Sequence, residues 1–181
     1  MRYAIRAGLT AIALLGAITL FAATGIGTPP PTPGGNGKAP EFVGIGRWLN
    51  SEPLAMSSLR GKVVLVDFWT YGCINCVRTL PHVTQWYDKY RDQGLVVVGV
   101  HTPEFAAEKS TANVQAAIKR FGIRYPVAQD NAYATWGAYG NQYWPALYLV
   151  DADGRIVYQH FGEGRYAETE ATIQRLLAQR K

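Results

Sequence analysis

Apolar and polar residues alternate along most of the chain in runs that predict β-strands and α-helices. Residues 61–69, 95–101 and 145–150 contain the β-branched and aliphatic runs that are typical of buried strands. The turn sequence DADG at 151–154 predicts a β-hairpin that leads into a further strand at 155–161.

Three other segments repeat apolar residues at the spacing of an α-helix. These are Val77, Leu80, Val83, Tyr87 and Tyr90 in the first, Val114, Ala117, Ile118 and Phe121 in the second, and Ile173, Leu176 and Leu177 in the third. Thr111 is expected to cap the second helix, and Gly122 to end it. The order strand–helix–strand predicts an α/β fold with a mainly parallel sheet and helices on both faces. The final hairpin adds an antiparallel edge, so the sheet is expected to be mixed.

The N-terminal segment 1–27 has a different pattern, in which Arg2 and Arg6 precede an uncharged run at 7–27. As a helix this run would span about 31 Å, the thickness of a hydrocarbon core. The arginines favour a cytoplasmic N-terminus and export of the rest. Two alternatives remain open, an uncleaved membrane anchor and a signal peptide cleaved near Ala23-Thr24-Gly25. Either one predicts an exported protein that faces the periplasm or the outer side.

Composition separates a linker from a folded domain. Residues 28–40 are rich in proline and glycine and predict a linker, whereas 41–181 is expected to be one domain. The formal charge of +5 includes Arg2, Arg6 and Lys38, which precede that domain, so the domain itself is nearly neutral. Without a clustered basic stripe, no nucleic-acid partner is expected.

The two cysteines of the chain, Cys73 and Cys76, stand in the sequence TYGCINC. A zinc site needs at least three protein ligands, and His82, His101 and His160 follow no ligand spacing, so no metal is expected. An inert structural disulfide is disfavoured because such a short loop would restrain the unfolded chain only slightly.

The position of the pair favours redox chemistry. Cys73 follows a predicted buried strand and opens a predicted helix, where the helix dipole and free N–H groups stabilise a thiolate. Cys73 is therefore expected to be the nucleophile and Cys76, one turn further inward, the resolving thiol. No cofactor is expected other than the redox-active disulfide of these two residues.

The stretch VDFWTYGCINCVRTLP resembles the thioredoxin superfamily, and the resemblance covers essentially all of 41–181. It implies a thioredoxin-like fold with a central mixed sheet, and a buried acid, Asp67, that helps to deprotonate Cys76. Physical chemistry supports that role, because a buried acid is costly unless it is used or paired, and burial raises its pKa. The alternative is an ion pair with a core lysine such as Lys62.

A second stretch, YWPALYLVDADG, resembles the region around the cis-proline of that superfamily. The resemblance implies that Trp144 and Pro145 lie beside the two cysteines and contact the substrate. An ordinary trans proline at the start of a strand is the alternative. Trp69, Tyr71 and Trp144 are expected to line a hydrophobic substrate groove, unless they only pack in the core.

Finer features resemble the membrane-tethered TlpA/ResA/DsbE-like branch, and above all the thioredoxin-like domain of DipZ proteins. They include the motifs WTYGCINC and VHTPEF and the long insertion around the latter. Glu104 stands where that branch often has an acid facing the active site; a surface glutamate is the alternative. The multi-span membrane domain of DipZ proteins is not matched, so their electron delivery is not carried over.

These features predict an extracytoplasmic thiol–disulfide oxidoreductase that acts on protein thiols and disulfides. The branch favours a reductant, for example in cytochrome c maturation, which needs a membrane electron donor in an oxidising compartment. One alternative is a thiol peroxidase, since Thr70 and Cys73 satisfy T-x-x-C, although Val66 stands where peroxiredoxins have proline. Another is a binding module that keeps the cysteines as a vestige.

Overall fold

The computed structural model describes residues 37–180. The predicted anchor or signal at 1–27, and most of the predicted linker at 28–40, lie outside the described residues and stay predictions. Within 37–180, no helix has both the length and the apolar character needed to cross a membrane.

A six-stranded sheet organises the described residues, with the strand order β1-β4-β3-β2-β5-β6. The bounds are Arg47–Leu49 for β1, Val63–Trp69 for β2, Leu95–His101 for β3, Val127–Gln129 for β4, Ala146–Val150 for β5 and Ile156–Phe161 for β6. The four strands that the apolar runs predict are thus present. β1 and β4 were not predicted, because three residues are too few to show a pattern.

The sheet is mixed, as expected, but it is not mainly parallel. β2 pairs with β3, and β3 with β4, in parallel register, whereas β1–β4, β2–β5 and β5–β6 are antiparallel. The reversal lies next to the central strand, where Val66 pairs with Tyr148 of β5, and is not confined to the final hairpin. The expectation of an antiparallel edge alone was wrong, because apolar runs identify buried strands but not their direction.

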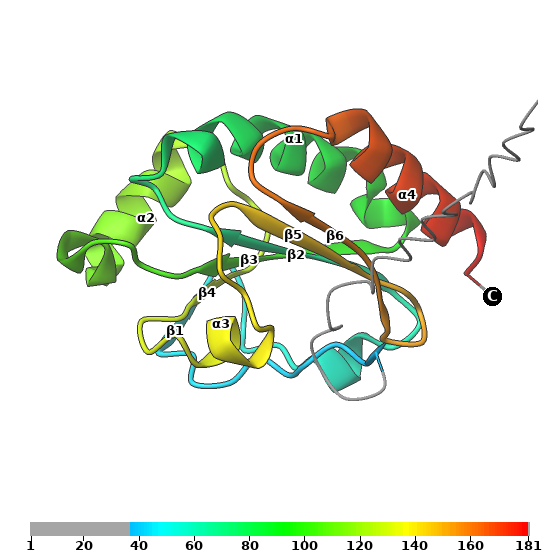
Figure 1. Ribbon diagram of the computed structural model, residues 1–181, viewed down its shortest axis with the longest axis horizontal. Coiled ribbons are helices and arrows are strands. Elements are labelled where there is room, and N and C mark those ends of the chain that lie inside the picture. The colour runs from blue at the N-terminus through cyan, green and yellow to red at the C-terminus, as the bar shows by residue number, and fades with distance from the viewer. Residues whose placement is uncertain (1–36, 181) are drawn as a thin grey trace, which may run out of the picture. The chain divides into compact units, whose positions relative to one another are not determined.

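Helices cover both faces of the sheet, but unequally. α1 (Ile74–Tyr90), α2 (Thr111–Arg120) and α4 (Tyr166–Ala178) lie on one face, and the short α3 (Ala134–Ala138) lies on the other (Figure 1). Single 3-10 turns, η2 (Met56–Leu59), η3 (Arg91–Gln93) and η4 (Ala106–Lys109), complete the fold. η4 and α2 form the insertion between β3 and β4.

Alternate residues of β2 pack into two separate hydrophobic cores. Val63, Leu65 and Trp69 pack with α1, α2 and α4, whereas Val64, Val66 and Phe68 pack with the opposite layer. This explains why β2 is buried along its whole length. Asp67 lies on the same face of the sheet as Leu65 and Trp69, the face that α1 covers, and it is the polar residue of that series.

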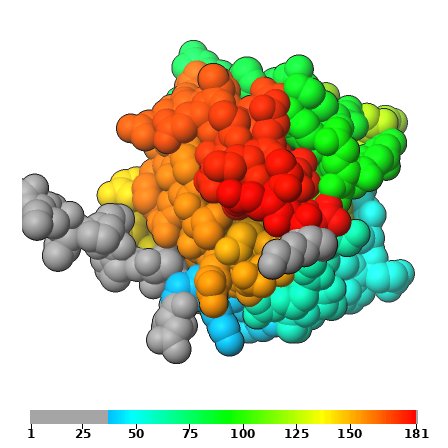
Figure 2. All heavy atoms as spheres, turned by 90° about the vertical axis from the view of Figure 1, so that its right-hand side faces the viewer, coloured from blue at the N-terminus to red at the C-terminus, as the bar shows by residue number. Residues whose placement is uncertain are grey.

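The C-terminal helix α4 covers the hairpin and one end of α1. In Figure 2 it lies across the β5–β6 hairpin and beside α1. Tyr158 on β6 and Thr169 on α4 share a hydrogen bond of 3.0 Å, and Lys89 on α1 pairs with Glu170 at 2.7 Å. The α1 layer is thereby closed on the side away from α2.

The start of α2 differs from the prediction by one residue. Ser110 caps the helix, since its side chain accepts a hydrogen bond from the Asn113 N–H, whereas the Thr111 hydroxyl donates to Gln129 Oε1 at 2.8 Å. Thr111 was a wrong choice because two adjacent hydroxyl residues satisfy the same capping pattern. The predicted stop is confirmed, since Gly122 follows the helix with a φ of +64°.

Candidate active site

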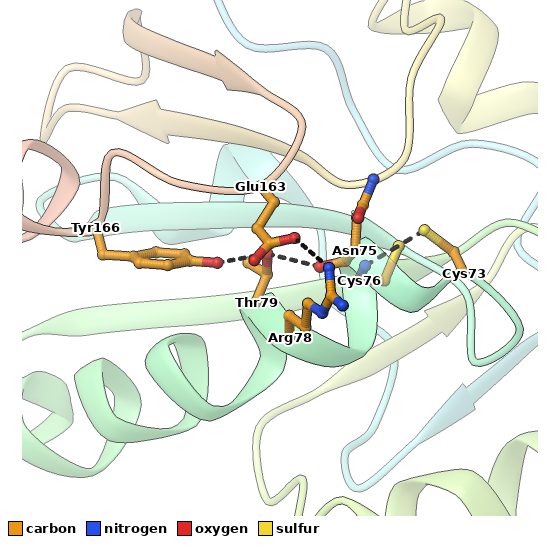
Figure 3. Close-up of polar contacts among 7 residues, drawn as sticks. All are labelled: Cys73, Asn75, Cys76, Arg78, Thr79, Glu163 and Tyr166. Carbon is orange, nitrogen blue, oxygen red and sulfur yellow. Dashed lines mark hydrogen bonds and ion pairs between the residues drawn. The ribbon is translucent and has the colours of Figure 1, made fainter.

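Cys73 and Cys76 lie where β2 gives way to α1. Cys73 caps the helix in an extended conformation, and its Sγ accepts a hydrogen bond of 3.3 Å from the Cys76 N–H (Figure 3). Cys73 is half-buried, Cys76 is buried, and both are free thiols. The predicted geometry, an outer sulfur on the helix N-terminus and an inner one a turn away, is therefore confirmed.

The two sulfurs differ in their surroundings. Burial, followed by the hydrogen bond with Cys73, raises the pKa of the Cys76 thiol far above its ordinary value, and the Thr70 backbone N–H offsets only part of this. The charge of Asp67 also contributes to the rise. Cys76 is therefore protonated at neutral pH.

Asp67 is a buried acid close enough to Cys76 for its charge to raise the pKa of that thiol. Its carboxyl group is 1% exposed, and within residues 37–180 neither of its oxygens has a hydrogen-bond partner. Burial raises its pKa to about 7. The ion pair with Lys62 is not formed, since Lys62 is exposed and the described residues contain no such bridge.

Trp144 and Pro145 are joined by a cis peptide bond, as the resemblance implied. Ala146 pairs with Phe68, so Pro145 lies at the same end of the sheet as the loop that leads to Cys73. The Trp144 indole N–H donates to the Thr102 carbonyl oxygen at 3.0 Å, which fixes the ring at this edge.

The predicted substrate groove is only partly formed by the predicted residues. Trp69 is fully buried and packs edge-on against His101, so it belongs to the core and not to a groove. Tyr71 is half-buried, stacks on His101 and lines a pocket with Asn113, Ala116, Ala117 and Arg120. For an apolar residue near the cysteines, the sequence does not distinguish a buried side chain from an exposed one, because it does not show which way the side chain points.

Exposed apolar side chains provide the hydrophobic surface instead. Ile74, between the cysteines, is 60% exposed, and Phe105 and Tyr143 are exposed to a similar degree. Phe105 lies close to Gly72, and Tyr143 precedes Trp144 and packs against Phe161. Sequence reasoning missed Phe105, although it stands in the motif VHTPEF.

The acid that faces the active-site loop is Glu108, and not Glu104. The Glu104 side chain is exposed, whereas Glu108 on η4 is buried. Glu108 accepts hydrogen bonds from the N–H groups of Gly72 at 2.8 Å, Glu104 at 2.6 Å and Phe105 at 3.0 Å. The carboxylate therefore ties the insertion to the residue before Cys73. The spacing of four residues between the two acids is one helical turn, and sequence alone did not separate them.

The pKa values of Glu108 and its neighbour His101 agree with these hydrogen bonds. Burial acts to raise the pKa of Glu108, but hydrogen bonds from Phe105, Thr70, Glu104 and Gly72 together lower it below its ordinary value. His101, beside it, is also buried, and burial lowers its pKa to about 4. At neutral pH the loop is thus held by a charged carboxylate next to an uncharged imidazole.

A second set of contacts holds the first turn of α1 from the α4 side. The Thr79 hydroxyl donates to the Asn75 carbonyl oxygen at 2.9 Å and lies 3.3 Å from the Tyr166 hydroxyl (Figure 3). Arg78 pairs with Glu163 at 3.4 Å, at the surface. Both ends of the CINC turn are therefore fixed by neighbouring elements.

Metal binding finds no support in this region. Across residues 37–180, the two sulfurs are not part of any group of three or more His, Cys, Asp and Glu side chains that could hold a metal ion. The chemistry of the arrangement is that of a dithiol with an adjacent acid.

Comparison with known proteins agrees with this geometry. A model of the AhpC/TSA family matches residues 36–159. Protein DipZ of Mycobacterium tuberculosis is 54% identical over 144 residues, which are 78% of this chain but only 21% of DipZ. Thiol-disulfide oxidoreductase YkuV of Bacillus subtilis is 31% identical over 77% of this chain and 94% of its own length.

Solved structures agree as well. The solution structure of a thioredoxin-like protein in its oxidised form superposes with a TM-score of 0.72 at 30% identity, and covers 80% of this chain and 97% of that one. The fold, the CxxC spacing at a strand–helix junction and these relatives lead to one assignment. The chain belongs to the AhpC/TSA family, in the TlpA/ResA/DsbE-like branch of thioredoxin-fold thiol–disulfide oxidoreductases.

Proposed function

We propose that this protein exchanges disulfides with protein substrates through Cys73 and Cys76. The observation that carries the proposal is the contrast between the two sulfurs. Cys73 is accessible and caps α1, whereas Cys76 is buried one turn away and near Asp67, whose oxygens have no hydrogen-bond partner among residues 37–180.

In the reducing direction the Cys73 thiolate attacks one sulfur of a substrate disulfide. The substrate S–S bond breaks, a Cys73–substrate disulfide forms, and the released substrate thiolate takes a proton from solvent. The helix N-terminus stabilises the attacking anion.

The resolving step uses Cys76 and Asp67. Cys76 transfers its proton to the Asp67 carboxylate and attacks Cys73 Sγ, which forms the Cys73–Cys76 bond and releases the second substrate thiolate. Two electrons pass from the dithiol to the substrate. With a pKa of about 7, Asp67 is near half ionised at neutral pH, so it can both accept this proton and return it in the oxidising direction.

Substrate contacts are assigned to the exposed edge around Cys73. Ile74, Phe105 and Tyr143 supply apolar contact area, and Trp144 and Pro145 supply the edge of the sheet. This surface suits an unfolded or extended protein segment that carries a cysteine, because such segments expose apolar side chains.

An extracytoplasmic location is the second part of the proposal. The charge order of residues 1–27 supports export, and the resemblance to the ResA and DsbE branch supports work outside the cytoplasm. A reductant there, for example for cytochrome c maturation, draws its electrons from a membrane donor. Residues 7–27, if uncleaved, keep the protein near that donor.

Single-cysteine variants of the full-length chain test the exchange mechanism. Cys76→Ser should accumulate a mixed disulfide with a model disulfide protein, because the attack occurs but resolution does not, whereas Cys73→Ser should form none. Gel shift under non-reducing conditions measures both. The mechanism fails if Cys76→Ser traps no substrate, or if Cys73→Ser traps as much.

A thiol peroxidase is the alternative enzyme, and the position of Thr70 speaks against it. The Thr70 hydroxyl is fully buried and lies 3.3 Å from His101 Nε2, so it is directed away from solvent and from an incoming peroxide. Rapid peroxide consumption with a sulfenic acid at Cys73 would favour the peroxidase. Full biological activity of Cys73→Ser would favour the binding module.

A further inference from the structure

Trp136 and Trp144 pack their indole rings together and connect the two hydrophobic cores. The ring centroids are 4.2 Å apart and the ring planes are tilted by 37°. Trp144 packs against the core that Cys73 also contacts, whereas Trp136 packs against the core on the other face of the sheet. The pair therefore links the active-site side of the sheet to α3, which lies on the opposite face from α1 (Figure 1).

The position of α3 is fixed by Asp130, whose carboxyl group is fully buried. Its oxygens accept hydrogen bonds from the N–H groups of Ala134 at 2.9 Å, Thr135 at 3.4 Å and Trp136 at 2.8 Å. Asp130 follows β4 directly, and its own N–H donates to the His101 carbonyl oxygen at 2.9 Å. Because a helix of five residues has little stability of its own, this carboxyl group is what anchors Trp136 to the sheet.

Asn141 joins the same helix to the segment that contains Trp144. Its main-chain N–H donates to the Trp136 carbonyl oxygen at 3.0 Å, and its side-chain amide donates to the Tyr143 carbonyl oxygen at 3.1 Å. Its side-chain oxygen accepts a hydrogen bond of 3.0 Å from the Tyr148 hydroxyl on β5. Asn141 is 4% exposed, so water competes little for these bonds. The main chain beside each ring of the indole pair is thus held by the same residue.

The Trp144 ring has two attachments of different kinds. Its indole N–H donates to the Thr102 carbonyl oxygen, which holds one edge, and the Trp136 ring supports its face. A ring held only by one hydrogen bond can still turn about that bond, and the ring contact removes this freedom. A contact surface that is ordered before binding loses less conformational freedom when a partner binds. The affinity of a partner that touches Trp144 should therefore depend on Trp136.

We propose that Trp136 is a positioning residue for the substrate, and that it holds the Trp144 ring in the orientation that contacts a protein segment bound at Cys73. The inference rests on the proposed function and deepens it, because the affinity for the residues around the substrate cysteine then depends on α3. The sulfur chemistry does not, since the groups that shift the pKa of the Cys76 thiol all lie on β2 or in the loop that leads to α1.

The substrate class that fits this arrangement is an extended segment with apolar residues beside its cysteine. Trp144 offers an apolar ring, and the neighbouring Tyr143 is 55% exposed. A small disulfide without flanking residues gains nothing from either ring. Its reaction with the dithiol should therefore be the same whether or not Trp136 supports Trp144.

Trp136→Leu in the full-length chain tests the proposal, because leucine keeps an apolar side chain and removes the ring. One substrate is a short extended peptide whose single cysteine, flanked by apolar residues, is joined to thionitrobenzoate by a disulfide bond. Attack of Cys73 on the peptide sulfur releases thionitrobenzoate, and Cys76 then forms the Cys73–Cys76 bond and releases the peptide thiol. The second substrate is the symmetrical thionitrobenzoate disulfide, which has no flanking residues and releases the same coloured thiolate.

The half-saturating concentration of the peptide should rise about three- to tenfold in Trp136→Leu, which is the effect of losing one aromatic pair. The maximal rate with the peptide, and the rate with the symmetrical disulfide, should stay unchanged. Trp136→Phe keeps a ring and should recover most of the affinity. The circular dichroism band of the two coupled indoles should disappear in Trp136→Leu, which reports the ring pair without any exchange reaction.

Trp48→Leu is the matched control. Trp48 on β1 is also half-buried and packs against the same core as Trp136, but it pairs edge-on with Phe42 at 5.5 Å and lies at the edge of the sheet away from β5. It should leave the half-saturating concentration and the coupled band unchanged. An equal rise in both leucine variants would overturn the proposal, because lost core packing would then explain it.

The remaining outcomes separate this inference from the proposed function. An unmodified protein without the coupled band, or an unchanged half-saturating concentration in Trp136→Leu while both substrates still react, would overturn the role of Trp136 alone. An unmodified protein that releases thionitrobenzoate from neither substrate would overturn the proposed function, and the role of Trp136 with it.

Discussion

The buried carboxyl group of Asp67 has a pKa well above its ordinary value. Asp67 takes a place in an otherwise apolar strand, and burial raises its pKa from 3.8 to about 7. In the unfolded chain it would ionise near pH 4, so between pH 4 and 7 the folded state binds more protons than the unfolded state. The stability that this group contributes is therefore complete below pH 4 and is lost as pH rises to 7.

We predict that Asp67→Asn removes this pH dependence. The free energy of unfolding of the unmodified protein should fall by on the order of 4 kcal/mol between pH 4 and pH 8 on account of Asp67, and the variant should lack that fall. Chemical denaturation at several pH values measures it. Asp153→Asn, at an exposed aspartate, should keep the original slope. An unaltered slope in Asp67→Asn would mean that Asp67 ionises normally in the folded protein.

Some residues of the candidate site were identified from the sequence, and others were missed. Cys73 and Cys76 were identified from their spacing and from their place between a predicted strand and a predicted helix, whereas Asp67 and Pro145 were identified from the resemblance to the thioredoxin superfamily. Glu108 was missed in favour of Glu104, because both acids lie within one turn of the insertion.

At the scale of elements, the insertion between β3 and β4 supports the active-site loop. η4 delivers the Glu108 carboxylate to the Gly72 N–H, and the Tyr71 hydroxyl donates to the Ala107 carbonyl oxygen at 2.9 Å. Strand and helix positions were predicted well, because buried runs and helical spacing are local signals. The pairing of β5 beside β2 was not, because strand direction depends on how the chain returns across the sheet.

Glu108→Ala and Glu104→Ala form a matched pair at this scale. We expect Glu108→Ala to lower the free energy of unfolding by about 2–4 kcal/mol and to slow exchange at Cys73, since three N–H groups lose a charged acceptor. Glu104→Ala, at an exposed side chain, should change stability by no more than about 0.5 kcal/mol. Denaturation and a disulfide-exchange rate assay compare them. Equal effects would remove the proposed distinction between the acids.

At the scale of the whole molecule, the reduction potential of the Cys73–Cys76 couple sets the direction of electron flow. An exported dithiol with a low potential works as a reductant and needs a source of electrons, whereas one with a high potential oxidises its partners. The branch to which the chain belongs favours the reducing direction.

We therefore predict a reduction potential for the Cys73–Cys76 couple close to that of thioredoxin, about −270 mV. Equilibration of the full-length chain against dithiothreitol or glutathione buffers measures it, with the thiol content read by alkylation. A value near that of DsbA, about −120 mV, would make the protein an oxidant and contradict the proposed direction.

The clamp from Glu108 has a consequence for how such proteins diversify. The two cysteines lie between β2 and the first turn of α1. Glu108, which binds the Gly72 N–H, and the exposed Phe105 lie in a separate stretch between β3 and β4. The two stretches meet through the hydrogen bonds from the Gly72 N–H to the Glu108 carboxylate and from the Tyr71 hydroxyl to the Ala107 carbonyl oxygen. Exchanging residues 102–122 between relatives should therefore change which substrates the protein prefers, while the cysteine motif stays the same.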